Sequence, residues 1–157
     1  MAREIEELDE NDLKILRLLQ ENCKLTTKEL AAKIHLSTTP TFERQHRLER
    51  LGYIQKYVAV LDSNKLKRGF VVWCNVSFRR INKEITSLFR ETVEEWDEVT
   101  ECYNVSGDCD FLLKVCVHNM AEYQKFVIDK IGAFEYISNI KSVFVMDTFK
   151  LRYGLPV

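Results

Sequence analysis

The stretch of sequence that decides the fold runs from Thr26 to Ile54 and reads TTKELAAKIHLSTTPTFERQHRLERLGYI. Polar capping residues open two short amphipathic segments within it, and a glycine closes the second segment. Two short helices joined by a tight turn, with the second leading into a strand, form the pattern of a helix-turn-helix. The stretch therefore predicts a DNA-binding motif whose second helix presents one face to a DNA groove.

Capping residues predict where the first two helices begin. Asp9 can cap a helix that ends near Asn22. Thr26 and Glu29 form a capping box for the second helix, because each side chain can bond the backbone N–H of the other residue. Leucine, isoleucine and alanine recur at helical spacing in both segments, so each helix has one apolar face. The turn His35-Leu36 then leads to a third helix.

The third helix is the candidate reading helix of the motif. Ser37 or Thr39 caps it, and Gly52 ends it as a C-terminal glycine. A strand at Tyr53–Leu61 is expected to follow, which would make the motif a winged variant. A plain three-helix bundle without a DNA role is the alternative, since capping boxes occur in any helix.

The surface of the third helix favours DNA binding over the plain bundle. Threonine hydroxyls and a helix amino end suit phosphate or base-edge contacts, arginine suits guanine or phosphate, and a glutamate can accept from cytosine N4. The chain has a net charge of −1, but residues 35–68 carry seven basic and three acidic side chains, and phosphate responds to local charge. The candidate DNA-binding residues are Ser37, Thr38, Thr39, Thr41, Glu43, Arg44 and Arg47.

The second half of the chain has the element order β-α-β-β-α-β. Apolar residues alternate along the predicted strands, and asparagines stand at the predicted helix starts. This order predicts a ferredoxin-like sheet with both helices on one face, and hence an α+β protein: a winged helix-turn-helix in residues 1–61, a linker in 62–69 and the sheet domain in 70–157. The predicted elements are strand Phe70–Phe78, a helix capped by Asn82, strands Val99–Ser106 and Phe111–Val117, a helix capped by Asn119, and a long strand Ile140–Lys150.

Two strands of this sheet are apolar on both sides. Val71 and Trp73 alternate with Val72 and Cys74, whereas a solvated sheet face is normally polar. We therefore expect two copies to pack sheet against sheet as a homodimer, which also presents two reading helices to a palindromic site. A monomer with an unusually apolar surface is the alternative.

Composition argues against several other classes of protein. No apolar run reaches membrane-spanning length, and the opening residues MAREIEELDEND are acidic rather than signal-like, so a cytoplasmic protein with no membrane partner is expected. The five cysteines include an evenly spaced set at positions 102, 109 and 116, but with His118 that spacing fits no common zinc pattern, and buried free thiols are the favoured reading. The chain has no phosphate loop and no nucleophile–base pair, so neither an enzyme nor a cofactor is expected.

The first half resembles the Lrp/AsnC (leucine-responsive/asparagine-regulator) family of prokaryotic transcription regulators. The resemblance implies a winged helix-turn-helix whose third helix enters the major groove. The chain departs from the family pattern at Thr38, where a proline is usual, at Gln45, where an aliphatic residue is common, and at Glu43 and His46, where arginines are frequent. The matching residues are Leu8-Asp9, Ile15-Leu16, Leu30-Ala31, Leu36-Ser37, Thr39-Pro40, Arg47-Leu48-Glu49 and Gly52-Tyr53-Ile54.

The second half resembles the effector domain of the same family. The closest matches are Val105 through Asp108, Asp110 through Val115, and Met120 through Phe126. The resemblance implies an amino acid or related small molecule bound between subunits near a Gly-Asp-x-Asp loop, and dimers that commonly assemble into octamers. The effector-binding candidates are Asn104, Gly107, Asp108, Asp110 and Met120.

Two interpretations of this effector site stay open on the sequence. Carboxylates beside a glycine can receive an α-ammonium group, but Gly107-Asp108 can equally be an ordinary hairpin turn. Cys109 stands where the family often has an aromatic residue, which can alter the ligand that fits. The sequence thus predicts a sequence-specific regulator of amino-acid metabolism, with a purely architectural DNA-binding protein as the alternative.

Overall fold

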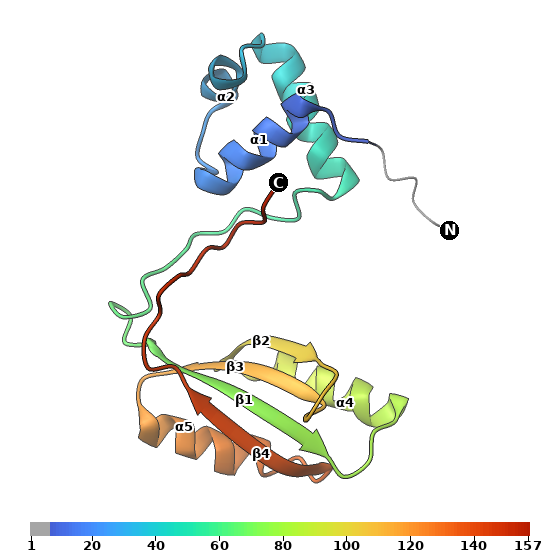
Figure 1. Cartoon of the computed structure of the whole chain (residues 1–157), viewed down its shortest axis with the longest axis vertical. Coiled ribbons are helices and arrows are strands. Elements are labelled where there is room, and N and C mark those ends of the chain that lie inside the picture. Colours follow the sequence, from blue (N-terminus) through green and yellow to red (C-terminus); the bar gives the residue numbers. More distant parts are fainter. Residues whose placement is uncertain (1–6) are drawn as a thin grey trace. The chain divides into compact units, whose positions relative to one another are not determined.

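The structure is a computed structural model that describes residues 7–157 (Figure 1). Residues 1–6, which belong to the acidic opening of the sequence, lie outside the described residues. The chain divides into two compact units: residues up to Ala59 together with Lys150–Val157 make the first, and Val60–Phe149 makes the second. Each unit is considered by itself.

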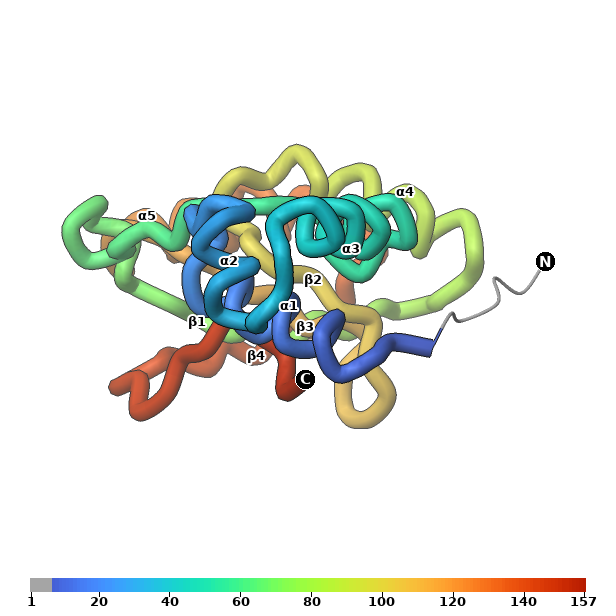
Figure 2. Tube along the Cα trace, turned by 90° about the horizontal axis from the view of Figure 1, so that it is seen from above, coloured from blue at the N-terminus to red at the C-terminus, as the bar shows by residue number. Residues whose placement is uncertain are grey.

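The first unit holds three helices around one apolar core, and Figure 2 shows their close grouping. They are α1 (Glu10–Glu21), α2 (Thr27–Ile34) and α3 (Thr38–Leu51). The predicted cap Asp9 and the predicted capping box of Thr26 and Glu29 are confirmed, and Asp9 also forms a capping box with Asp12 that the sequence analysis did not predict. The fully or nearly fully buried core side chains are Ile15, Leu19, Leu30, Ile34 and Leu48.

The C-terminal end of α2 forms the tight turn of the motif, and a left-handed residue terminates α3. His35 ends α2 in the left-handed region, at φ 58°. Gly52 ends α3 at φ 83°, where glycine has no Cβ to strain. The N–H of Tyr53 donates to Leu48 O and that of Gly52 to Glu49 O, so these two carbonyls near the end of the helix are satisfied.

The strand predicted at Tyr53–Leu61 does not form in this chain. Between α3 and the first strand of the second unit, the described residues contain no strand. A strand exists only where its N–H and C=O groups pair with a neighbouring segment, and no ladder partner is available to residues 53–61 here. Val58, Val60 and Leu61 consequently stay 60%, 60% and 66% exposed.

The second unit is a four-stranded antiparallel sheet with strand order β2-β3-β1-β4. Its buried residues form one cluster with those of α4 and α5, so both helices cover the same face of the sheet (Figure 1). The βαββαβ order predicted from the sequence is present. The elements are β1 (Phe70–Phe78), α4 (Lys83–Glu94), β2 (Val99–Asn104), β3 (Phe111–Val117), α5 (Met120–Phe126) with a π-helical turn (Val127–Ile131), and β4 (Ile137–Phe144).

The last strand is shorter at its end than predicted, and it begins earlier. It covers Ile137–Phe144 instead of Ile140–Lys150. Phe144 pairs with Val72, and the N–H of Val145 donates to Val71 O. Because β1 begins at Phe70, little of that strand is left for residues beyond 145 to pair with, and the chain leaves the sheet.

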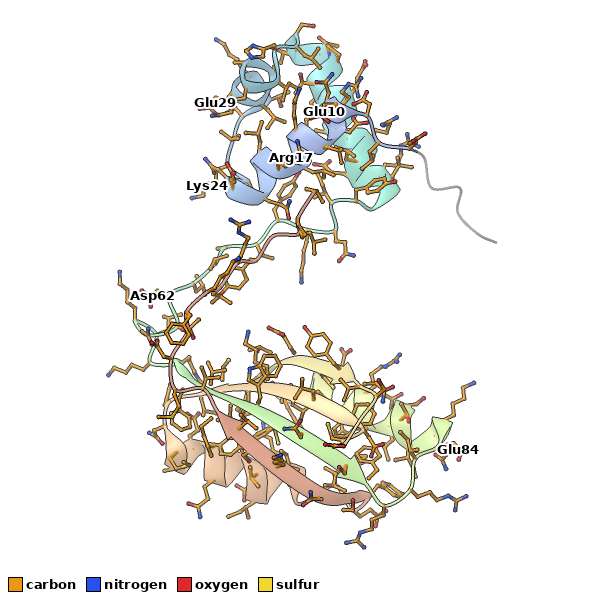
Figure 3. The ribbon with its side chains drawn as sticks, in the orientation of Figure 1. Glu10, Arg17, Lys24, Glu29, Asp62 and Glu84 are labelled. Atoms are coloured by element: carbon orange, nitrogen blue, oxygen red, sulfur yellow. The ribbon has the colours of Figure 1, made fainter. Side chains whose placement is uncertain are left out.

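The C-terminal residues Lys150–Val157, which the sequence predicts as the end of the domain at residues 70–157, bond to α1 and group by contacts with the first unit. Arg17 Nε on α1 donates to the carbonyl of Val157 over 2.5 Å. Gln20 Nε2 donates to Leu155 O over 3.2 Å, and the N–H of Leu155 donates back to Gln20 Oε1. Figure 3 labels Arg17 on α1, and these bonds explain why Lys150–Val157 groups with the helices.

Candidate DNA-binding face and effector site

The outward face of α3 is the surface that a helix-turn-helix would offer to DNA. Thr41 and Leu48 face the core and are fully buried. Among the remaining positions, the exposed side chains on the outward side of the helix are Thr38, Thr39, Phe42, Glu43, His46 and Arg50.

Phe42 is the unexpected member of this face. Its residue surface is 50% exposed, although phenylalanine is usually buried. The ring meets the imidazole of His46 edge to face, with centroids 4.2 Å apart and an interplanar angle of 80°. His46 Nδ1 in turn lies 2.9 Å from Glu49 Oε2.

Arg44 and Arg47, two of the predicted DNA contacts, reach back onto α1. Arg44 Nη1 lies 2.8 Å from Asp12 Oδ1 and 2.6 Å from Asp9 Oδ2, and Arg47 Nη2 lies 2.6 Å from Asp12 Oδ2. The Asp12 side chain is fully buried, and a buried carboxylate requires charged or hydrogen-bonding partners. The two arginines therefore tie α3 to α1 within the first unit.

The electrostatics of this tie follow from the hydrogen bonds. The backbone N–H of Asp12, and then Arg44, hold the pKa of Asp9 below its usual value. The bonds to Asp12 and Asp9 raise the pKa of Arg44 above its usual value. Asp9 thus has two roles: it caps α1, and it forms an ion pair with Arg44 of α3.

Thr41 is not available to DNA, which corrects one predicted contact. Its hydroxyl donates to Ser37 O over 2.9 Å, and the residue is completely buried. Ser37 takes the N-cap position of α3 but its side chain makes no capping bond. Ser37, Thr38, Thr39 and Glu43 are all exposed, as a DNA-contacting role requires.

Gln45 stands where the family prefers an aliphatic residue, and the polar groups around its side chain explain why an amide is accommodated there. Its Nε2 donates to Tyr57 Oη over 3.1 Å and to Glu49 Oε1 over 3.3 Å, and the Tyr57 hydroxyl donates to the same Glu49 oxygen over 2.8 Å. Burial, followed by the bond to Glu49, raises the pKa of Tyr57. These bonds fasten the segment after α3 to the last turns of the helix.

The predicted effector loop is a compact hairpin connection between β2 and β3. Gly107 has φ 136°, with open space where a Cβ would stand. The side-chain carboxylate of Asp110 accepts from the N–H of Phe78 over 2.7 Å. The backbone carbonyl of Asp110 accepts from the N–H of Val105 and from Asn104 Nδ2. The structure therefore brings four candidates, Asn104, Gly107, Asp108 and Asp110, to one end of the sheet.

Met120 lies away from the other candidates within one chain. It is 51% exposed and begins α5, just after β3, whereas the loop just precedes β3. The seven residues of β3 span about 23 Å at the usual rise of a strand. Met120 can join the loop residues in one site only if it comes from a second copy.

A cavity that the sequence did not predict lies between α4 and β2. Its volume is about 520 Å³, with Phe89 and Phe111 among its apolar lining and Arg90, Glu94 and Asn104 among its polar lining. The periodicity of side chains does not predict such a cavity, because the size of the cavity depends on the distance between the helix and the edge of the strand. It adjoins the effector loop through Asn104.

Other kinds of site were also considered. Within residues 7–157 no group of three or more histidine, cysteine, aspartate or glutamate side chains is placed to hold a metal ion. All five cysteines are free thiols, and Cys74 is the buried one. No helix in the described part of the chain is long and apolar enough to cross a membrane.

Comparison with known proteins assigns both halves of the chain. Residues 8–55 match a model described as winged helix-turn-helix DNA-binding, and residues 71–155 match one described as the Lrp/AsnC ligand binding domain. The chain belongs to the Lrp/AsnC family. These proteins are DNA-binding transcription regulators, and the fold class predicted from the sequence is confirmed.

Relatives of known name match along nearly the whole chain. The Bkd operon transcriptional regulator of Pseudomonas aeruginosa is 36% identical over 151 residues, covering 96% of this chain and 99% of that protein. The leucine-responsive regulatory protein of Escherichia coli (strain K12) is 33% identical over 151 residues, covering 96% and 92%.

Solved structures of the family agree with this architecture. The transcriptional regulator NMB0573 of Neisseria meningitidis, solved as an L-Met complex, has a TM-score of 0.91 at 33% identity, covering 96% of this chain and 97% of that one. An AsnC family transcriptional regulator from Agrobacterium tumefaciens has a TM-score of 0.91 at 38% identity, covering 95% and 97%.

Proposed function

We propose that this Lrp/AsnC protein binds specific operators and regulates genes of amino-acid metabolism in response to an amino acid or related small molecule bound between subunits. The observation that carries the proposal is the exposed face of α3, a helix-turn-helix reading face, in a chain that also carries the family's ligand-binding domain. The proposal has no catalytic step and places the protein in the cytoplasm, beside the chromosome it reads.

For DNA, the proposed contacts come from the amino end and outer face of α3. Ser37, Thr38 and Thr39 can donate to phosphates or base edges, and Glu43 can accept from cytosine N4. Arg44 and Arg47 keep a supporting role, because their side chains remain 29% and 30% exposed and can contact flanking phosphates while bonded to Asp12.

For the effector, the proposed site is built around the hairpin loop. Asp110 already accepts a backbone bond from Phe78, so the α-ammonium group falls to Asp108, which is exposed. Backbone N–H groups beside Gly107 can meet the α-carboxylate, since glycine lets the ligand approach closely. Met120 from a second copy would then line the side-chain end of the pocket. The L-Met complex of the Neisseria relative supports an amino acid as the ligand class.

For assembly, the proposal is a homodimer that can grow into an octamer. The face of the sheet opposite the helices carries Val71, Trp73 and Val143, and Val143 is 46% exposed. Burying such a face against a second copy gains free energy at about 25 cal/mol for each Å² of apolar surface. A site that needs Met120 of one copy and Asp108 of another also requires this association.

The experiment combines DNA selection with calorimetry. Genomic fragments bound by the protein are sequenced with and without pooled amino acids, and each amino acid is then titrated by calorimetry. We expect a recurring palindromic motif, and at least one amino acid that binds and changes the selection. Asp108→Asn should weaken that ligand by about tenfold or more, as the loss of a charged hydrogen bond implies.

The matched control is Asp97→Asn, an exposed aspartate just before β2, at the end of that strand opposite the loop. This variant should bind the ligand like the unmodified protein. DNA selection without any recurring motif would refute the reading-face assignment. A motif without binding of any amino acid would instead favour an architectural DNA-binding protein.

A further inference from the structure

Phe42 is an exposed aromatic side chain on the one helix face that the proposed function directs at DNA. Single exposed apolar residues are ordinary on protein surfaces. This one lies on the second turn of α3 beside Thr38 and Glu43, and it is not among the residues that form or pack against the apolar core of the unit. We propose that Phe42 is a specificity-determining residue that reads thymine through its C5-methyl group, with His46 as its positioning residue. The inference rests on the proposed DNA-binding function.

The location of Phe42 along α3 suits base contact. Residues near the amino end of a recognition helix reach base edges, whereas later residues approach the backbone. Thr38, Phe42, His46 and Arg50 follow one another at four-residue spacing, and each is exposed. Successive members are about 6 Å apart along the helix axis. Phe42 therefore lies one turn from the helix start, and Arg50 lies near the end, where a phosphate contact is expected.

The ring of Phe42 is held in place before any DNA arrives. The edge-to-face contact with His46 fixes one side of the ring, and His46 Nδ1 lies 2.9 Å from Glu49 Oε2. At this distance the imidazole nitrogen can donate to the carboxylate, which can only accept. Glu49 is itself held by the Tyr57 hydroxyl at 2.8 Å. This series of contacts restricts the ring, and a restricted side chain loses less entropy on binding.

The chemistry of a phenyl ring selects one base in the major groove. It has no hydrogen-bond donor or acceptor, and the apolar group that bases present there is the thymine methyl. The neighbouring Glu43 can take a cytosine N4 donor, so this part of the face favours pyrimidines on the contacted strand. Arg44 and Arg47, which would otherwise read guanine, are bonded to Asp12.

The test uses a duplex carrying the operator found by genomic selection, with fluorescence anisotropy as the measurement. Each thymine in a half-site is replaced in turn by deoxyuridine, which removes only the methyl group. For the unmodified protein we expect one position per half-site where this change weakens binding about fourfold, the effect of one buried methyl group. For Phe42→Ala the ratio of the two affinities at that position should fall to about one.

Two further variants make the result specific to this ring. Phe149→Ala removes another phenylalanine, 96% exposed and outside the reading face, and should keep the fourfold discrimination. His46→Ala frees the ring without removing it and should leave an intermediate ratio. Phe42→Gln repeats the test with a side chain that favours helix, and circular dichroism and the melting temperature check that both Phe42 variants fold.

The outcomes separate this inference from the proposed function. If the unmodified protein selects no DNA motif, the proposed function fails and the inference fails with it. If the motif is found but Phe42→Ala discriminates thymine from uracil as well as the unmodified protein, the inference alone is overturned. It is also overturned if Phe42→Ala leaves the ratio unchanged and lowers the mass in light scattering, which would make the ring a contact between copies.

Discussion

Replacing Asp12 by asparagine should loosen α3 from α1 and leave the sheet unit untouched. The Asp12 carboxylate is fully buried and accepts from three groups: Arg44 Nη1, Arg47 Nη2 and the backbone N–H of Asp9. Asparagine keeps the shape but has one oxygen, and its NH2 group would point at a guanidinium donor. The charge that compensates both arginines would be lost as well.

The magnitude follows from the bonds that change. Charged hydrogen bonds contribute about 1.5–3 kcal/mol and neutral ones about 0.5–1.5 kcal/mol, so weakening the two arginine bonds costs about 2 kcal/mol. A buried donor left facing another donor adds about 1–2 kcal/mol. The sum of about 3–4 kcal/mol matches the usual cost of breaking a buried ion pair. For a unit of this size it lowers the melting temperature by about 20–30 °C.

The assay can follow the two units separately. Both tryptophans, Trp73 and Trp96, lie in the second unit, so their fluorescence reports on the sheet unit alone. Circular dichroism also reports the helices of the first unit. In urea, Asp12→Asn should move the helical transition to lower concentration and leave the fluorescence transition in place. The matched control is Glu10→Gln on the same helix, where the ion pair with Arg17 is 3.4 Å long and its glutamate is 64% exposed (Figure 3).

The reasoning would be refuted by an Asp12→Asn variant whose helical transition stays within about 0.5 kcal/mol of the unmodified protein, the range of ordinary surface changes. A second variant tests the cause. Replacing all three charged residues together, as Asp12→Leu, Arg44→Met and Arg47→Met, should recover most of the lost stability, because no buried charge is then left unpaired.

Three further predictions concern other parts of the chain. Gly52→Ala should destabilise the first unit by about 1 kcal/mol in a urea titration, since φ is 83° there and only the left-handed backbone penalises the added Cβ. Trp73→Asp, on the open face of the sheet under Lys114 Nζ at 5.9 Å, should disperse oligomers, and an unchanged mass in light scattering would count against a sheet interface. The hydrogen bond from Lys114 lowers the pKa of Glu101 in the folded protein. The stability that this ion pair contributes is therefore complete above the unfolded pKa of Glu101 and is lost as pH falls through the lower folded pKa. Glu101→Gln should flatten the acid side of a plot of unfolding free energy against pH, and an equally steep plot would show that the pair is not responsible.

Local features of the fold could be predicted from the sequence because they depend on neighbours within a few residues. The cap at Asp9, the capping box at Thr26 and the C-terminal glycine Gly52 are of this kind. The end of β4 and the absence of a strand at residues 53–61 are not, since each depends on whether another segment is present to pair with.

The three arginines of α3 show that residue spacing alone does not predict which side chains face outward. Three residues turn a helix by about 300°, so Arg44, Arg47 and Arg50 drift by about 60° at each step. Only Arg50 stays on the outward face, while Arg44 and Arg47 find a buried carboxylate more than thirty residues earlier in the chain. Helical phase taken from the buried Thr41 and Leu48 would have identified Phe42 as exposed, but the partner role of Asp12 required the tertiary structure.

The bonds between Gln20 and Leu155 have a consequence for how the protein folds. They join residues 135 positions apart, and everything needed for the sheet lies between them. The helices of the first unit can form as soon as they are made, but their last segment arrives only after β4 has been synthesised. Contacts that close so long a loop form late and slowly. The sheet is therefore expected to be complete while the first unit is still missing its final segment, Lys150–Val157.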